Sequence, residues 1–189
     1  MSSLFTEADG DRYLTVFDVG SARPETVEFF AQYRCRLYVA DLYTEDVVVH
    51  QHDEAIAADL YGRFSQLFSY PAFTQFDICL LWDLPNYLDK PALRAFSKAL
   101  YPFLSPSTRI HGFGTLKSST KLPHQQFAIQ QADCLSVRPG EGSQLPCYPH
   151  PQAELKRLLY GMDVSKATLL SNGLLEMLLE VTDPHPAPR

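Results

Sequence analysis

The sequence lacks the features that mark several large classes of protein. It has four cysteines in 189 residues, and no two of them form a CxxC pair. We therefore expect reduced thiols, as in a cytoplasmic protein, and no disulfide framework or zinc site at Cys35, Cys79, Cys134 and Cys147. No apolar run approaches the roughly 20 residues that a membrane-spanning helix needs. The acidic and polar start, MSSLFTEADGDR, lacks the pattern of a secretory signal.

Positive charge is also scarce. Lys and Arg number 16 against 22 Asp and Glu, which gives a formal net charge of -6. Nucleic acids and anionic membrane surfaces both select clustered Lys and Arg, so we expect neither as a partner. The composition, 46% hydrophobic and 20% charged, is that of a globular chain. Its length suits one domain with a sizeable core.

The chain divides into three parts by composition. We predict a flexible lead over residues 1–12, a single domain over residues 13–182, and a disordered tail over residues 183–189, where alternating prolines exclude regular structure. Strand and helix patterns alternate within the domain. Buried-strand patterns occur in YLTVFDV, CRLYVADL, FDICLLWDL and TRIHGFG. Helix patterns cover residues 24–33, 54–69, 90–104 and PQAELKRLLYGM.

Several details of these elements follow from local patterns. In the first helix we expect Val27, Phe30 and Ala31 to face the core. SPS, residues 105–107, should end the third helix. QFAIQQ and CLSVRP predict one hairpin, and Asn172-Gly173 between two apolar runs predicts another. VVVHQ is the one candidate for a strand between Asp41 and Phe76, which leaves open whether the sheet is short by one strand there.

The alternation predicts an α/β fold with a mostly parallel sheet, helices on both faces and a C-terminal antiparallel hairpin. Over residues 13–181 this order resembles the Rossmann-like fold of class I S-adenosylmethionine-dependent methyltransferases. Asp18 and Gly20 match the start of the family's glycine loop, and Asp41 matches the acid that holds the ribose. The chain looks most like a bacterial group of methyltransferase-like proteins that share DxGxxxxxxxxFF, WDLxNYL and a late NGxxE. The resemblance gives a fold and no reaction.

The resemblance implies a site for S-adenosylmethionine at the carboxyl ends of the strands. Its residues would be Asp18, Gly20, Ser21, Ala22, Arg23, Asp41, Leu42, Trp82 and Asp83. The loop is degenerate, because the family's three alternate glycines read Gly20, Ala22 and Pro24 here. Pro24 removes a backbone N–H that would meet the ligand's carboxylate, and Arg23 offers a replacement by pairing with that carboxylate.

Other polar stretches surround this predicted site. Asn86, Tyr87 and Tyr148 are candidates for contact with an acceptor or a partner, the last in CYPHP, which could form a rigid lip. KSSTK, residues 117–121, is either a contact for an anionic acceptor or a solvated connection. HQHDE, residues 50–54, lacks a third ligand, so we expect an exposed polar loop and no metal.

Two functions remain open on the sequence. We favour a non-catalytic module that binds a partner protein or a small ligand, because the loop has lost two glycines. The alternative is an active S-adenosylmethionine-dependent methyltransferase acting on a small molecule or a protein. Methyl transfer depends on positioning and desolvation, so the sequence names no catalytic residue. A nicotinamide-dependent oxidoreductase fits less well, since pyrophosphate needs closer glycines. Helix faces rich in Phe and Tyr suit either a core or a homodimer.

Overall fold

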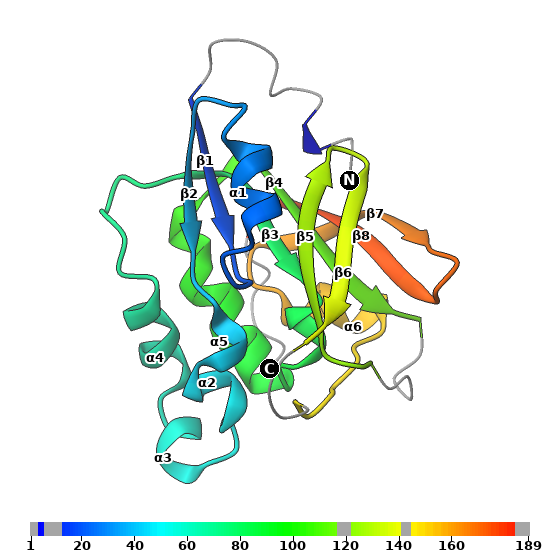
Figure 1. Ribbon diagram of the computed structural model, residues 1–189. Helices are drawn as coiled ribbons and strands as arrows, with labels where there is room; N and C mark the ends of the chain where they lie inside the picture. The colour runs from blue at the N-terminus through cyan, green and yellow to red at the C-terminus, as the bar shows by residue number, and fades with distance from the viewer. Residues whose placement is uncertain (1–3, 6–12, 117–121, 141–144, 184–189) are drawn as a thin grey trace.

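The computed structural model describes residues 4–5, 13–116, 122–140 and 145–183. Its centre is a six-stranded sheet in the order β2-β1-β3-β4-β8-β7 (Figure 1). The first four strands in this order are parallel, and β8 runs antiparallel to both of its neighbours, β4 and β7. The predicted α/β fold is confirmed. The strands are β1 (Leu14–Asp18), β2 (Cys35–Val39), β3 (Phe76–Trp82), β4 (Leu104–Thr115), β7 (Met162–Leu169) and β8 (Leu174–Val181).

Helices cover both faces of this sheet (Figure 1). On one face, Phe68 after α4 packs against Phe17 of β1 and against Phe96 of α5. On the other face lies α1, whose Phe30 is 1% exposed. The helices are α1 (Pro24–Phe30), α2 (Asp46–Val49), α3 (Glu54–Ala57), α4 (Leu60–Leu67), α5 (Lys90–Leu100) and α6 (Gln152–Leu158), with short 3-10 turns η2 (Leu42–Thr44), η3 (Leu84–Asn86) and η4 (Tyr101–Phe103).

Two predicted helices differ from those observed. The helix predicted over residues 54–69 is two helices, because the Asp59 side chain accepts a 2.9 Å hydrogen bond from Gly62 N and begins α4. α1 ends at Phe30 and buries Thr26 and Phe29 beside it. Its other predicted core residues, Val27 and Ala31, are exposed, so that part of the prediction was wrong.

The boundary predicted at SPS was also wrong, and most of the candidate strand VVVHQ is helical. Ser105–Ser107 lie inside β4, where the pairing with β3 shifts register between Phe76 and Ile78, so SPS does not separate helix from strand. Val47–Val49 lie in α2, so VVVHQ is not a strand. Residues 41–75 are all described and contain no strand, which makes β2 an edge of the sheet.

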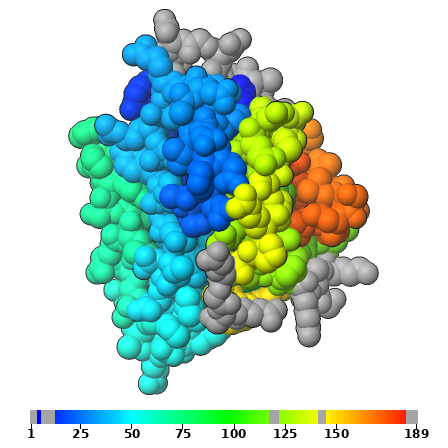
Figure 2. Space-filling view, viewed as in Figure 1, coloured from blue at the N-terminus to red at the C-terminus, as the bar shows by residue number. Residues whose placement is uncertain are grey.

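Both predicted hairpins are confirmed. β7 and β8 close the sheet, while β5 (Gln125–Gln131) and β6 (Cys134–Pro139) form a separate two-stranded sheet. Figure 2 shows this second hairpin beside α1 on the viewed face. Ile129 N donates a 3.0 Å hydrogen bond to the buried Thr26 Oγ1, which ties β5 to α1. The hairpin therefore packs against the first turn of α1, directly after the loop that follows β1.

Parts of the predicted lead and tail lie outside the described residues. Leu4 and Phe5 are described and buried, and the Phe5 ring lies 5.0 Å from that of Phe29. These two residues therefore belong to the core. All four cysteines are free thiols. Among the described residues, no helix is long and apolar enough to span a membrane.

Candidate functional site

The candidate site lies at the carboxyl edge of the sheet, between β1 and β3. The chain continues from β1 to β2 on one side, while β3 follows on the other, so the strand order reverses here. Open α/β sheets bind ligands at such a reversal. The loop after β1, the η2 turn after β2 and the last residue of β3 meet at this point.

A pocket of about 340 Å³ opens at this edge. Half of its lining was predicted from the sequence, namely Gly20, Ser21, Ala22, Arg23, Asp41 and Trp82. The other half was missed, namely Tyr43 and Thr44 of η2 and the hairpin residues His124, Gln125, Gln126 and Phe127. The volume is within the range of small-molecule sites. The hairpin thus supplies one wall of the pocket.

Asp18 and Trp82 are joined behind this pocket. Trp82 Nε1 donates a 2.6 Å hydrogen bond to Asp18 Oδ1, and Gly20 N donates a 2.8 Å bond to the same oxygen. Asp18 is 2% exposed. Burial raises the pKa of Asp18 to about 7, although both hydrogen bonds oppose that shift. The predicted cofactor ligand Asp18 therefore binds the protein's own indole and does not line the pocket.

Trp82 reaches this position through an uncommon backbone conformation. Its φ is +47°, a left-handed value that bulky residues rarely adopt. The register of β3 against β4 shifts between Leu80 and Trp82, which turns the last residue inward. A Cβ added to Gly20 would lie 3.1 Å from Trp82 Nε1. The bare face of Gly20 therefore receives the indole, at the place where a ligand would approach the loop.

The hairpin covers Trp82 from the other side. The rings of Trp82 and Phe127 stack with centroids 5.4 Å apart and planes at 6°. Arg23 Nη1 donates a 2.9 Å hydrogen bond to Gln126 Oε1, and Arg23 Nε lies 3.9 Å from Glu25 Oε2. The guanidinium predicted to replace the lost N–H lines the pocket, but it is engaged by the hairpin and by its own helix.

Asp41 lines the pocket from the end of the loop after β2. Its φ of +44° is left-handed, and Asp41 N donates a 3.1 Å hydrogen bond to Gly20 O, which links the two loops. Burial raises the pKa of Asp41, and the nearby His124 partly offsets this. Burial lowers the pKa of His124, whose ring stacks on Tyr43 at 5.4 Å. His124 Nδ1 is buried and makes no hydrogen bond within the described chain.

The loop after β3 turns its polar residues inward. Tyr43 Oη donates a 2.6 Å hydrogen bond to Asp83 Oδ1, and Tyr87 Oη lies 3.3 Å from Oδ2. Burial raises the pKa of Asp83 to about 6, against the effect of these two hydroxyls. Asn86 Nδ2 donates to the carbonyls of Asp83 and Phe113, at 3.0 and 2.7 Å.

Several predicted site residues therefore lie outside the pocket. Asp83, Asn86 and Tyr87 are at most 2% exposed, and Leu42 is fully buried. None of these four lines the pocket, and the observed bonds give them a structural role.

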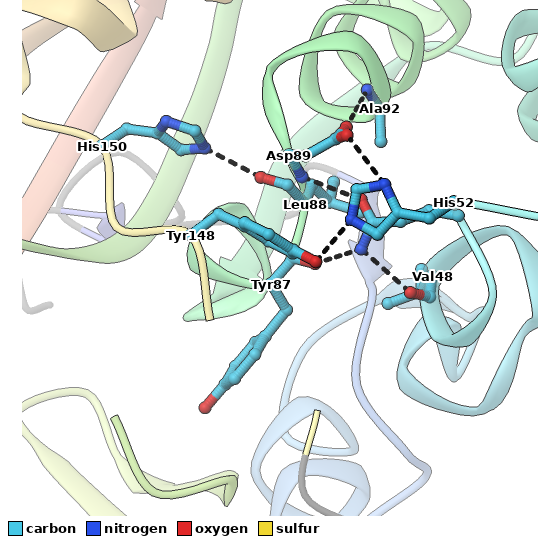
Figure 3. A network of polar contacts seen from close by, with 9 residues as sticks. Val48, His52, Tyr87, Leu88, Asp89, Ala92, Tyr148 and His150 are labelled. Carbon is cyan, nitrogen blue, oxygen red and sulfur yellow. Dashed lines mark hydrogen bonds and ion pairs between the residues drawn. The ribbon is translucent and has the colours of Figure 1, made fainter. Parts of the chain in front are cut away.

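Tyr148 does not line the pocket either, and it belongs to the network of polar contacts in Figure 3. Its hydroxyl contacts His52 Nε2 at 2.5 Å, and His52 Nδ1 is 3.5 Å from Asp89 Oδ2. Tyr148 N donates to Asn86 O at 2.6 Å, so CYPHP packs along the loop after β3 and forms no lip over the pocket.

Two predicted polar stretches remain, HQHDE and KSSTK. His50 and His52 are exposed, whereas Gln51 is buried and donates to Tyr87 O at 2.8 Å. Within the part of the chain that the structure describes, no three His, Cys, Asp or Glu residues group as a metal site would require. KSSTK lies outside the described residues.

No family model matches the chain, and no curated protein matches its sequence. Solved structures match by fold. The 1,6-didemethyltoxoflavin-N1-methyltransferase of Burkholderia thailandensis is 16% identical with a TM-score of 0.51, over 96% of this chain and 77% of that one. An S-adenosylmethionine-dependent methyltransferase from Clostridium acetobutylicum is 11% identical with a TM-score of 0.51, over 96% and 90%.

A third structure, the mitomycin 7-O-methyltransferase MmcR, is 11% identical with a TM-score of 0.53, and the match covers 89% of this chain and 49% of that one. This chain therefore has the fold of class I methyltransferases, as the sequence predicted. At these identities the likeness concerns the fold alone.

Proposed function

We propose that the protein is a non-catalytic binding module with the methyltransferase fold, and that its pocket takes an adenosine-containing ligand. The observation that carries this proposal is the contact between Trp82 and Gly20. The indole covers the loop and buries Asp18, while an open pocket with Asp41 on its wall persists beside it.

The pocket has the chemistry that a nucleoside needs. A carboxylate at the end of the second strand accepts hydrogen bonds from a ribose diol, and Asp41 holds that place. Tyr43 and Phe127 offer apolar surface to a base, and Gln125 offers a polar amide. The B. thailandensis enzyme was solved with S-adenosylhomocysteine, which supports the same ligand class for this fold.

Methyl transfer requires more than adenosine binding. The sulfonium must lie in line with an acceptor in a desolvated site. Here the indole of Trp82 occupies the space over Gly20, and the next loop uses Asp83, Asn86 and Tyr87 in internal hydrogen bonds. We infer that a ligand engages the Asp41 side of the pocket and that no methyl group is transferred.

The second candidate is an active S-adenosylmethionine-dependent methyltransferase. The observation that favours it is the open pocket, which the residues of the β1 loop and Asp41 line together. For this function, Trp82 has to leave Gly20 when the cofactor binds. Displacing it would break the bond to Asp18 and the stack on Phe127.

Isothermal titration with S-adenosylhomocysteine tests the ligand proposal. We expect saturable binding that weakens at least about tenfold in Asp41→Asn, because asparagine tolerates the left-handed conformation but removes the charge. Asp53→Asn is the matched control, since Asp53 is exposed and makes no side-chain cap. Absence of binding by folded protein would contradict the ligand proposal. Turnover of S-adenosylmethionine with any acceptor would contradict the non-catalytic reading.

A further inference from the structure

Helices α5 and α6 concentrate positive charge on an acidic protein. Three basic residues on α5 and two on α6 make five of the chain's sixteen Lys and Arg, whereas the net charge is -6. On α5 these are Lys90, Arg94 and Lys98, which are all exposed. Their spacing of four residues places them in one row along the helix.

A groove of about 480 Å³ runs between the two helices. Its apolar part is formed by Pro151, Ala153 and Leu158, and its rim by Lys90, Arg94, Glu154 and Arg157. The helices are fixed to each other, since Tyr160 N donates a 3.0 Å hydrogen bond to Ser97 Oγ and Arg94 Nη2 lies 3.5 Å from Arg157 O. The groove is therefore preformed.

The charges around this groove are only partly compensated. Lys90 Nζ lies 2.5 Å from Glu154 Oε1, and Lys98 Nζ lies over the Tyr61 ring at 5.1 Å. Arg94 and Arg157 are exposed and have no carboxylate partner within the described chain. Like charges four residues apart destabilise a helix. The row of basic residues on α5 therefore lowers the stability of the helix, and an anionic partner would offset this effect.

We propose that this α5–α6 groove binds an acidic segment of a partner protein. An apolar side chain of the segment would lie on Pro151 and Ala153, and its carboxylates would pair with Arg94 and Arg157. Guanidinium groups bind carboxylates in a bidentate geometry. The apolar floor favours a segment that carries an apolar side chain over a nucleic acid, whose contacts are mainly to phosphate.

Fluorescence anisotropy with defined probes tests this proposal. The probe is a fluorescein-labelled peptide of glutamates around two leucines, and its glutamine counterpart is the control peptide. We expect saturable binding of the glutamate peptide that weakens at least about tenfold in the double variant Arg94→Glu, Arg157→Glu. Lys166→Glu, an equally exposed charge reversal on β7, should leave the affinity unchanged. High salt should also weaken binding.

A second variant guards against a folding defect. Ala153 is exposed, so Ala153→Asp should fold normally while it places a negative charge on the groove, and it should also weaken binding at least about tenfold. The proposal is overturned if the glutamate peptide does not bind, or if neither set of substitutions changes its affinity. Tighter binding of a labelled DNA oligonucleotide would overturn it in favour of a polyanion surface. A dimer that the double variant dissociates would instead identify a second copy as the occupant.

Discussion

The Trp82 indole nitrogen donates a 2.6 Å hydrogen bond to the carboxylate of Asp18, a residue 64 positions earlier in the chain. Asp18 ends β1 and Trp82 ends β3, so this bond joins two adjacent parallel strands at the edge where the pocket opens. It uses two residues that the resemblance assigns to the cofactor. The indole of Trp82 therefore occupies the space over the loop after β1. To make this bond, Trp82 adopts a strained, left-handed backbone conformation.

The buried carboxyl should make stability depend on pH. The pKa of Asp18 is about 7 in the folded protein against an ordinary value of 3.8. Between these values the folded state binds more protons than the unfolded state, so stability falls as pH rises from about 4 to about 7. Asp18→Asn cannot ionise and keeps an oxygen for both donors. We expect it to match the wild type near pH 4 and to exceed it above pH 7 by on the order of 4 kcal/mol.

Urea unfolding at a series of pH values measures this difference. Asp83, whose pKa is raised to about 6, adds a trend of the same sign. That trend is common to both proteins, so it cancels in the comparison. Equal pH dependence of the two proteins would show that folding does not raise the pKa of Asp18.

Trp82→Phe should separate the hydrogen bond of the indole from its bulk. A phenyl ring retains most of the stacking on Phe127 but cannot donate to Asp18, which keeps only the bond from Gly20 N. We expect a loss of about 1–3 kcal/mol in the free energy of unfolding at neutral pH or above. In the Asp18→Asn background the loss should be smaller, because a neutral acceptor is less costly to leave unpaired. Additive losses in this double-mutant cycle would contradict the coupling.

One buried side-chain acceptor contributes to the attachment of the hairpin to α1. Thr26 is 1% exposed, and its hydroxyl accepts the Ile129 N–H. Thr26→Val keeps the shape and removes the acceptor, so we expect a loss of about 1–3 kcal/mol. Amide hydrogen exchange should rise mainly in β5. Ser107→Ala, at an exposed position of β4, is the control. Unchanged exchange at Ile129 would show that the hairpin is held by other contacts.

Two glycines allow a matched test of backbone conformation. Gly161 and Gly173 both have positive φ, +68° and +84°. A Cβ at Gly161 would overlap the Tyr101 ring, whereas a Cβ at Gly173 meets no atom within 4 Å. Gly173→Ala should therefore cost only the left-handed conformation, about 1–2 kcal/mol, and Gly161→Ala clearly more. Thermal unfolding of the two variants gives the comparison, and equal costs would contradict the steric argument.

The order of the elements and the place of the pocket were predictable from sequence. Residues at strand ends are fixed by the hydrophobic pattern, and Gly20 and Asp41 accordingly line the pocket. The start of a new helix at Asp59 was also predictable, because Asp is a favoured N-cap residue whose side chain accepts a backbone N–H two or three residues later. Trp82 was predicted as a cofactor contact, and nothing in the local sequence predicts its left-handed φ.

The hairpin wall of the pocket was not predictable from local patterns. His124 and Phe127 lie about a hundred residues from the β1 loop, and only the docking of β5 on α1 brings them to it. The same holds for Asp83, which was predicted to contact the cofactor at the end of a strand. Its partners Tyr43 and Tyr87 come from separate turns, and that tertiary arrangement buries it.

The most direct test of the central claim is the ratio of two affinities, measured by isothermal titration of the wild-type protein with adenosine and with S-adenosylhomocysteine. If Trp82 stays on Gly20, the amino-acid part of S-adenosylhomocysteine adds little binding free energy. The two dissociation constants should then agree within about threefold. Tighter binding of S-adenosylhomocysteine by about a hundredfold or more would mean that the arm displaces the indole. That result would contradict the claim that Trp82 stays on Gly20, and it would favour an active methyltransferase.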